Sequence, residues 1–224
     1  MRQMWHCALL IAACDSAPSN VDAPPVDNPV DEAACEPRTL LIGGTDVVAQ
    51  GWTTVTQVPF TLSDGAGVTQ LQTMTPAAGP SGQLLLRDAD ALDISLPFSL
   101  EVVMQVERVD PHNPLDSAAA IMGSYTAPFG GPGERAQMIY LDRDKIGWAD
   151  DVQQFSVAVT DGAFHSFVLS VDGPSGNAKV SIDGVPALTR GGFVYNGTIA
   201  IGDQTNDRNV DSSIRIKSVR LLCR

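Results

Sequence analysis

Basic residues, histidines and aromatic residues are all scarce in this chain of 224 residues. Lys and Arg together number 14, against 26 Asp and Glu, so the formal net charge is −12 at pH 7. Proteins bind nucleic acids and anionic membrane surfaces through basic patches that displace counterions. The composition therefore argues against both as partners, although net charge says nothing about the fold.

Long hydrophobic runs and helical periodicity are also missing. The apolar run near the start, from Cys7 to Ala13, is far shorter than the roughly 20 residues that a transmembrane helix needs. After residue 36 no helical period continues for about three turns. The first absence argues against a membrane-spanning helix, and the second favours an all-β fold.

The start of the chain has the features of a signal peptide over residues 1–13. Arg2 supplies the early positive charge, a short apolar run follows, and small Ala12 and Ala13 precede Cys14. The tetrad Ile11-Ala12-Ala13-Cys14 resembles the lipobox of bacterial lipoproteins, in which the Cys becomes the new N-terminus and carries lipid. This resemblance implies lipidation at Cys14. The alternative is an ordinary secretory signal in which that Cys occurs by chance.

Residues 14–35 are expected to form a disordered tether. Asp15 to Glu32 is rich in Pro, Ser and Asp and has no aromatic or basic residue, so it cannot bury enough surface to fold. Together with the lipid, this segment predicts a protein of the bacterial cell envelope, with the outer membrane or the cell surface favoured. The lipid anchor is then the protein's only contact with the membrane.

The chain has only four cysteines, and two of them are expected to pair. If Cys7 leaves with the signal peptide and Cys14 is acylated, Cys35 and Cys223 remain as the natural disulfide in an oxidising envelope. The Cα atoms of a disulfide lie within about 7 Å of each other. The pairing therefore predicts that the first and last strands of the folded region are neighbours.

Period-two alternation predicts strands throughout residues 36–224. In the segment from Ser213 to Leu222 the apolar positions change parity, which predicts a β-bulge near Lys217 or Ser218. Asp183-Gly184 predicts a tight turn. The residues expected to face inward are Phe98, Leu100, Val102, Met104, Val106, Phe155, Val157, Val159, Phe167, Leu169, Val171, Ala178, Val180, Ile182, Ile199 and Ile201. The pattern indicates an all-β sandwich or barrel.

The order of short motifs in residues 98–222 resembles the laminin-G-like, concanavalin A-like jelly roll. The motifs are Asp161-Gly162 with Phe164-His165, Asp183-Gly184, Ile201-Gly202, and Ile216 to Arg220. The resemblance implies a two-sheet antiparallel jelly-roll sandwich over residues 36–224, with the N- and C-terminal strands side by side. That arrangement agrees with the cysteine argument.

Members of this family bind glycans, cleave glycans or mediate protein adhesion, so the fold does not select a function. The glucanase branch carries Glu-x-Asp-x-Glu on one strand, which places three carboxylates on one face. Here Glu101 is followed at the same parity by Val103 and Gln105, so no catalytic residue is assigned. We expect a monomeric, non-enzymatic binding module for glycan. A protein adhesion module and a glycan-cleaving enzyme of another type are the alternatives.

Two acidic segments are candidate Ca²⁺ sites, because Ca²⁺ takes six to eight oxygen ligands. The first segment holds the pair Asp150 and Asp151. The second is the loop that holds Asp203, Asn206, Asp207, Asn209 and Asp211. The alternative is that these side chains only stabilise turns, by bonding to their own backbone.

Aromatic and polar side chains near these segments are candidate ligand contacts. Trp148 and Tyr125 are candidate platforms for a sugar, and Asn206 is a candidate polar contact. Tyr140 lies in a stretch that is apolar at both parities, so it is expected to be buried. His165 shares parity with inward-facing residues and is expected to be a hydrogen-bonded structural histidine. His112 lies in a Pro-rich loop and is expected to be a turn residue.

Overall fold

The computed structural model describes residues 37–56, 61–73, 82–86, 96–113, 117–122, 138–193, 195, 197–205 and 210–222. All of these residues belong to one compact unit, Ala33–Arg224. Within these ranges the chain forms strands, turns and a single 3₁₀ turn, η1 (Gly173–Ser175). No helix in these ranges is long and apolar enough to cross a membrane. The predicted signal peptide and tether, with Cys14, Cys35 and Cys223, lie outside the described residues.

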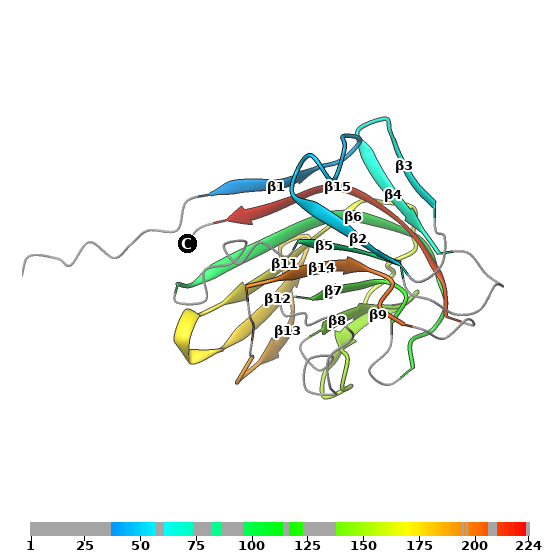
Figure 1. The fold of residues 1–224 in the computed structure, drawn as a ribbon. Helices are drawn as coiled ribbons and strands as arrows, with labels where there is room; N and C mark the ends of the chain where they lie inside the picture. Colours follow the sequence, from blue (N-terminus) through cyan, green and yellow to red (C-terminus); the bar gives the residue numbers. More distant parts are fainter. Residues whose placement is uncertain are drawn as a thin grey trace, which may run out of the picture. The chain divides into compact units, whose positions relative to one another are not determined.

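The strands form two antiparallel sheets (Figure 1). In the eight-stranded sheet the order is β13-β12-β11-β6-β15-β4-β3, and β1 pairs with β15. The bounds of these strands are β1 Arg38–Ile42, β3 Thr61–Gly65, β4 Val68–Gln72, β6 Phe98–Val109, β11 His165–Val171, β12 Ala178–Ile182, β13 Val185–Arg190 and β15 Ser212–Leu222.

The seven-stranded sheet has the order β10-β9-β8-β7-β14-β5-β2. The bounds of its strands are β2 Trp52–Thr56, β5 Gly82–Leu86, β7 Ala120–Met122, β8 Met138–Leu141, β9 Lys145–Trp148, β10 Gln154–Ser156 and β14 Ile199–Gly202. The all-β fold indicated by the alternation and the two antiparallel sheets implied by the resemblance are both confirmed. At one edge the two sheets are joined by the Trp148 indole N–H, which donates to the Thr189 carbonyl at 3.2 Å.

Strand β6 shows how the alternating pattern builds the core. Its residues Phe98, Leu100, Val102, Met104 and Val106 are all buried, as the alternation predicted. They pack with inward-facing side chains of both sheets in one hydrophobic cluster. Burying each such side chain contributes roughly 1.5–3 kcal/mol.

Strand β15 contains the predicted bulge, because its pairing with β6 shifts register between Ile216 and Ser218. The shift returns Val219 to the buried face after Ile216, so the change of parity in the sequence does not expose an apolar side chain. The first and last described strands are neighbours, with Arg38 opposite Leu221, as expected (Figure 1).

The segment around Phe155 differs from its prediction. Only Gln154–Ser156 forms a strand, and Phe155 is partly buried. The next two inward residues bond to a turn instead of a strand: the Val157 N–H donates to the Asp144 carbonyl at 3.0 Å, and the Val159 N–H donates to the Arg143 carbonyl at 3.0 Å. The predicted longer strand is wrong because the chain leaves the sheet at this edge.

Candidate functional site

One row of residues crosses the outer face of the seven-stranded sheet. Gly202, Ala120, Tyr140, Gly147 and Gln154 are successive cross-strand partners on five adjacent strands. The neighbours of Tyr140 in β8, Ile139 and Leu141, belong to the core cluster. Because side chains alternate along a strand, Tyr140 faces away from that core.

Tyr140 is fully buried although it faces outward. Its ring lies on Gly147, where an added Cβ would come within 2.6 Å of the ring. The His112 ring stacks on Tyr140, with centroids 3.7 Å apart and an interplanar angle of 18°. The predicted burial of Tyr140 is confirmed, but its cause is this contact with a glycine and a histidine and not a place in the core.

His112 joins two aspartates and is more than a turn residue. Its Nδ1 lies 2.7 Å from Asp142 Oδ2, and its backbone N–H donates to Asp142 Oδ1 at 3.0 Å. Its Nε2 lies 3.2 Å from Asp151 Oδ1. The prediction of a simple turn residue is therefore wrong, because the loop after β6 carries His112 to the turns that follow β8 and β9.

Asp151 is the centre of this cluster. It accepts hydrogen bonds from the Tyr140 hydroxyl at 3.0 Å and the Gln154 side-chain amide at 2.7 Å, in addition to its contact with His112. Its backbone has φ of 58°, which is uncommon for a residue other than glycine. The turn therefore holds Asp151 in a strained conformation that points its carboxylate at three side chains.

The charge state of the cluster follows from these contacts. Partial burial raises the pKa of the Asp151 carboxyl, but hydrogen bonds from Gln154, His112 and Tyr140 outweigh it and hold the pKa below its usual value. Burial, helped by the hydrogen bond to Asp151, raises the pKa of Tyr140 well above its usual value. The phenol therefore stays protonated as a donor, and Asp151 stays an anionic acceptor.

The exposed part of the cluster combines three kinds of group in the segment 151–154. The Asp151 side chain is 36% exposed, so its carboxylate reaches solvent while it keeps its internal donors. Gln154 is exposed beside it, and Val152 is 67% exposed. This surface therefore offers a fixed anionic acceptor, an amide and an apolar side chain to a ligand.

Trp148 is not a ligand platform. It is fully buried in the core, and the Arg190 guanidinium lies 5.6 Å from its ring centroid. Because Gly147 faces outward, the next residue in the strand must face inward. The prediction for Trp148 is wrong for this reason, and Tyr125 and Asn206 lie outside the described residues.

The Asp150-Asp151 pair does not form a metal site in this fold. The Asp150 carboxylate pairs with the Arg190 guanidinium at 2.5 Å, whereas the Asp151 carboxylate is held by His112, Tyr140 and Gln154. The two carboxylates thus have separate partners.

In the second acidic loop, the Asp203 carboxylate accepts from the Thr205 N–H at 3.0 Å, as in the turn-forming alternative. Asp211 is buried, with its N–H bonded to Asp110. Asp207 lies outside the described residues. Among the residues that are described, no three His, Cys, Asp or Glu side chains gather as metal ligands.

His165, the first residue of β11, forms a second cluster of this kind at the end of that strand in the eight-stranded sheet. Its Nδ1 lies 2.6 Å from Asp183 Oδ2, and its Nε2 lies 3.0 Å from Asp161 Oδ1. Burial lowers the pKa of His165, but its hydrogen bonds to the two carboxylates outweigh it and raise the pKa above the usual value. The predicted hydrogen-bonded structural histidine is confirmed.

Glu101, which was considered for catalysis, and Glu107 on the same strand have separate structural partners. Glu101 is ion-paired with Arg220 and accepts from the Ser166 hydroxyl at 2.9 Å. Glu107 accepts from the Ser213 hydroxyl at 2.7 Å. Each carboxylate thus stabilises the outer face of the eight-stranded sheet.

The comparisons with known proteins concern the fold. No family model matches the chain, and no curated protein matches it by sequence. A Lotus tetragonolobus seed lectin has 10% identity and a TM-score of 0.54, with 78% of this chain and 93% of the lectin covered. The metal-free lectin I-B4 of Griffonia simplicifolia has 14% identity and a TM-score of 0.51, covering 85% and 100%.

A third solved structure is the exoplasmic/lumenal domain of VIP36 in its Ca²⁺/Man-bound form. It has 12% identity and a TM-score of 0.51, with 77% of this chain and 82% of that domain covered. Identities this low compare folds only. The described residues therefore have the concanavalin A-like jelly-roll fold that these solved structures share, as the order of the sequence motifs predicted.

Proposed function

We propose that this protein is an envelope-anchored glycan-binding module and that the Asp151 cluster is its binding surface. The observation that carries the proposal is an anionic acceptor, partly exposed and held by three side chains, on the outer face of the seven-stranded sheet. The similar solved structures are lectins or a Man-bound domain, which supports a sugar as the ligand.

The chemistry of the surface suits a sugar. The Asp151 carboxylate accepts from neighbouring hydroxyls, and the Gln154 amide both donates and accepts. Exposed Val152 covers the C–H face of the ring. Because Asp151 is already ordered by its internal donors, binding a sugar costs little additional side-chain entropy. The mechanism is binding only, so no general acid is needed.

The test is a glycan array probed with the native protein, followed by calorimetry on the best ligand. Asp151→Asn is expected to weaken binding by about tenfold, because a charged hydrogen-bond acceptor is lost. The matched control is Asp46→Asn, at an exposed turn remote in sequence, whose carboxylate accepts from the Val48 N–H. Absence of any glycan ligand, or equal losses in the two variants, would contradict the proposal.

Calcium dependence is proposed for the loop from Asp203 to Asp211 alone. Binding to the native state would raise stability by roughly 2.7 kcal/mol at one hundred times Kd. Thermal unfolding in EDTA and in millimolar Ca²⁺, with Asp207→Ala as the variant, tests this proposal. An unchanged midpoint in both proteins would leave these aspartates as turn formers.

The envelope anchor is proposed on the lipobox-like tetrad and the polar segment that follows it. Cys14→Ala is expected to release the protein from the membrane fraction or to stall its processing. Mass spectrometry of the native protein is expected to find lipid on Cys14. Unchanged fractionation of the variant, with no lipid on the native protein, would remove the anchor from the proposal.

The disulfide between Cys35 and Cys223 is proposed because β1 begins three residues after Cys35 and β15 ends one residue before Cys223. The pairing of these strands places Arg38 opposite Leu221. Intact mass after alkylation without reduction tests the bond, since two labelled thiols would refute it. Cys35→Ser is expected to lower Tm by several degrees.

A further inference from the structure

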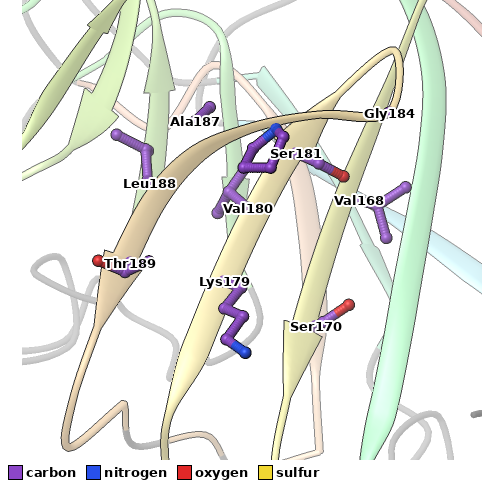
Figure 2. A pocket seen from close by; sticks show the side chains of 10 residues that line it. Val168, Ser170, Lys179, Val180, Ser181, Gly184, Ala187, Leu188 and Thr189 are labelled. Atoms are coloured by element: carbon purple, nitrogen blue, oxygen red, sulfur yellow. The ribbon is translucent and has the colours of Figure 1, made fainter.

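A hollow lies on the outer face of the eight-stranded sheet, over strands β11, β12 and β13 (Figure 2). Its volume is about 380 Å³, within the range of small-molecule pockets. We propose that it binds a small amphipathic monocarboxylate, with the carboxylate at Lys179 and the apolar body toward Gly184. This proposal is independent of the glycan site, which lies on the other sheet.

The hollow is a consequence of the register of the edge strand. Val180 pairs with Leu188, but the next residue, Ser181, pairs with Pro186, so Ala187 is an extra residue on β13. Pro186 has no N–H to donate and is tolerated because β13 is an edge strand. Figure 2 shows β13 arching across the outer face of β12, with the lining side chains beneath and beside it.

Two cross-strand rows give the hollow an apolar end and a polar end. The row nearer the turn at Gly184 consists of Val168, Ser181 and Pro186. The next row consists of Ser170, Lys179 and Thr189. In Figure 2, Lys179 and Ser170 lie at the end away from Gly184. A ligand that fills the hollow therefore meets hydrocarbon near the turn and an ammonium between two hydroxyls at the other end.

Lys179 gives the hollow its charge preference. In the part of the chain that the structure describes, no carboxylate pairs with Lys179, whereas Arg190 and Arg220 are both ion-paired. An ammonium that no described carboxylate neutralises, at the edge of a hollow, favours an anionic group there.

A second hollow of about 370 Å³ shares Lys179 and Thr189 and reaches Asp172. The Asp172 carboxylate disfavours a second anionic group there. A ligand with one carboxylate therefore fits the charges around Lys179 better than a dicarboxylate.

Octanoate is the probe for this proposal, titrated into the ¹⁵N-labelled native protein and followed by NMR. Amide shifts are expected at Val168, Ser181 and Ala187. Lys179→Gln is expected to weaken binding by about tenfold, because a charge-assisted contact is lost. The matched control is Lys217→Gln, which removes an exposed lysine of β15 that no described carboxylate pairs with and that does not line the hollow. 1-Octanol, which lacks the charge, is expected to bind the native protein only as weakly as octanoate binds Lys179→Gln.

Three results would overturn the proposal: no shifts at these amides in millimolar octanoate, equal losses in the two lysine variants, or octanol binding as tightly as octanoate. A second variant, Ser181→Phe, fills the hollow from the outer face of β12 and is expected to abolish binding. Its thermal unfolding curve verifies the fold. Octanoate binding that persists in folded Ser181→Phe would place the ligand elsewhere and refute the site.

Discussion

Two histidines of this fold each lie between two aspartates, yet the two clusters are built differently. Around His165 the carboxylates also accept backbone hydrogen bonds: Asp183 from the Ser166 N–H at 2.9 Å, and Asp161 from the Ala163 N–H at 2.8 Å. Asp161 is therefore part of a local turn, whereas Asp183 bonds to the backbone of β11 from the turn that follows β12. The imidazole contacts both carboxylates.

Around His112 the central carboxylate is held by side chains. Asp151 accepts from Tyr140 and Gln154 and contacts His112, and these residues come from two strands and a distant loop. Exposure does not separate the two clusters, because the side chains of Asp161 and Asp183 are 42% and 51% exposed and that of Asp151 is 36% exposed. The comparison teaches that a carboxylate bonded to backbone N–H groups stabilises the backbone around it. The Asp151 carboxylate is held by side chains instead, and we assign the ligand to it.

The largest expected effect is that of a substitution at Gly147, the glycine beneath the His112 cluster. Gly147→Ala places a Cβ within 2.6 Å of the buried Tyr140 ring, so the ring and His112 must shift. The overpacking is expected to cost about 2–3 kcal/mol and to lower Tm by about 8 °C. Calorimetry checks this value.

The matched control for this substitution is Gly191→Ala, whose Cβ would have its nearest neighbour at an ordinary 3.7 Å. It is expected to leave Tm nearly unchanged. Equal Tm values for the two variants would mean that the ring does not depend on Gly147.

The next prediction distinguishes the two histidines by the quantity that each substitution changes, Tm or glycan affinity. His165→Ala is expected to lower Tm by about 5 °C, through the loss of two charged hydrogen bonds, and to leave glycan affinity unchanged. His112→Ala is expected to weaken glycan binding by about tenfold, because Asp151 loses a hydrogen-bond partner and Tyr140 loses the ring that stacks on it. If His165→Ala alone impaired binding, the roles assigned to the two clusters would be reversed.

The smallest expected effect is the pH dependence of the His165 cluster. The pKa of His165 is raised above 6.5, so its contribution to stability is present below about pH 6.5 and is lost as pH rises through that raised pKa. The pKa values of Asp161 and Asp183 are lowered below 3.8, so their contribution is present above about pH 3.8 and is lost as pH falls through the lowered values.

The stability difference between the native protein and His165→Gln is therefore expected to be largest between about pH 4 and 6.5 and to shrink above that range. Thermal unfolding of both proteins from about pH 4 to 9 measures it. A difference that stays constant across the range would show that His165 does not stabilise through its charge.

Much of the fold could be predicted because alternation is a local property. The inward-facing side chains of β6, the bulge before Val219 and the turn at Asp183-Gly184 all appear where the sequence places them. The length of β10 was overestimated, because alternation does not reveal where a strand leaves its sheet for a turn.

The candidate site was much harder to predict. From the sequence, Asp151 was expected to be a metal ligand and Trp148 a sugar platform. Asp151 is part of the proposed binding surface, residues 151–154, and Trp148 lies three residues before it. The prediction for Trp148 failed because side chains alternate along β9. Gly147 faces outward beneath Tyr140, so Trp148 must face the core. The sequence held one signal for this orientation: Ile146 and Trp148 are apolar and alternate with Gly147, which places the two apolar side chains on the same face.

By itself the sequence determined the strands, their buried faces and the order of motifs typical of the jelly roll. Each of these depends on residues a few positions apart, whose side chains alternate whatever the rest of the chain does. Only the tertiary structure decided that His112 meets Asp142 and Asp151, which are 30 and 39 residues away. That meeting depends on the register of adjacent strands and on the path of a loop, which side-chain alternation does not specify.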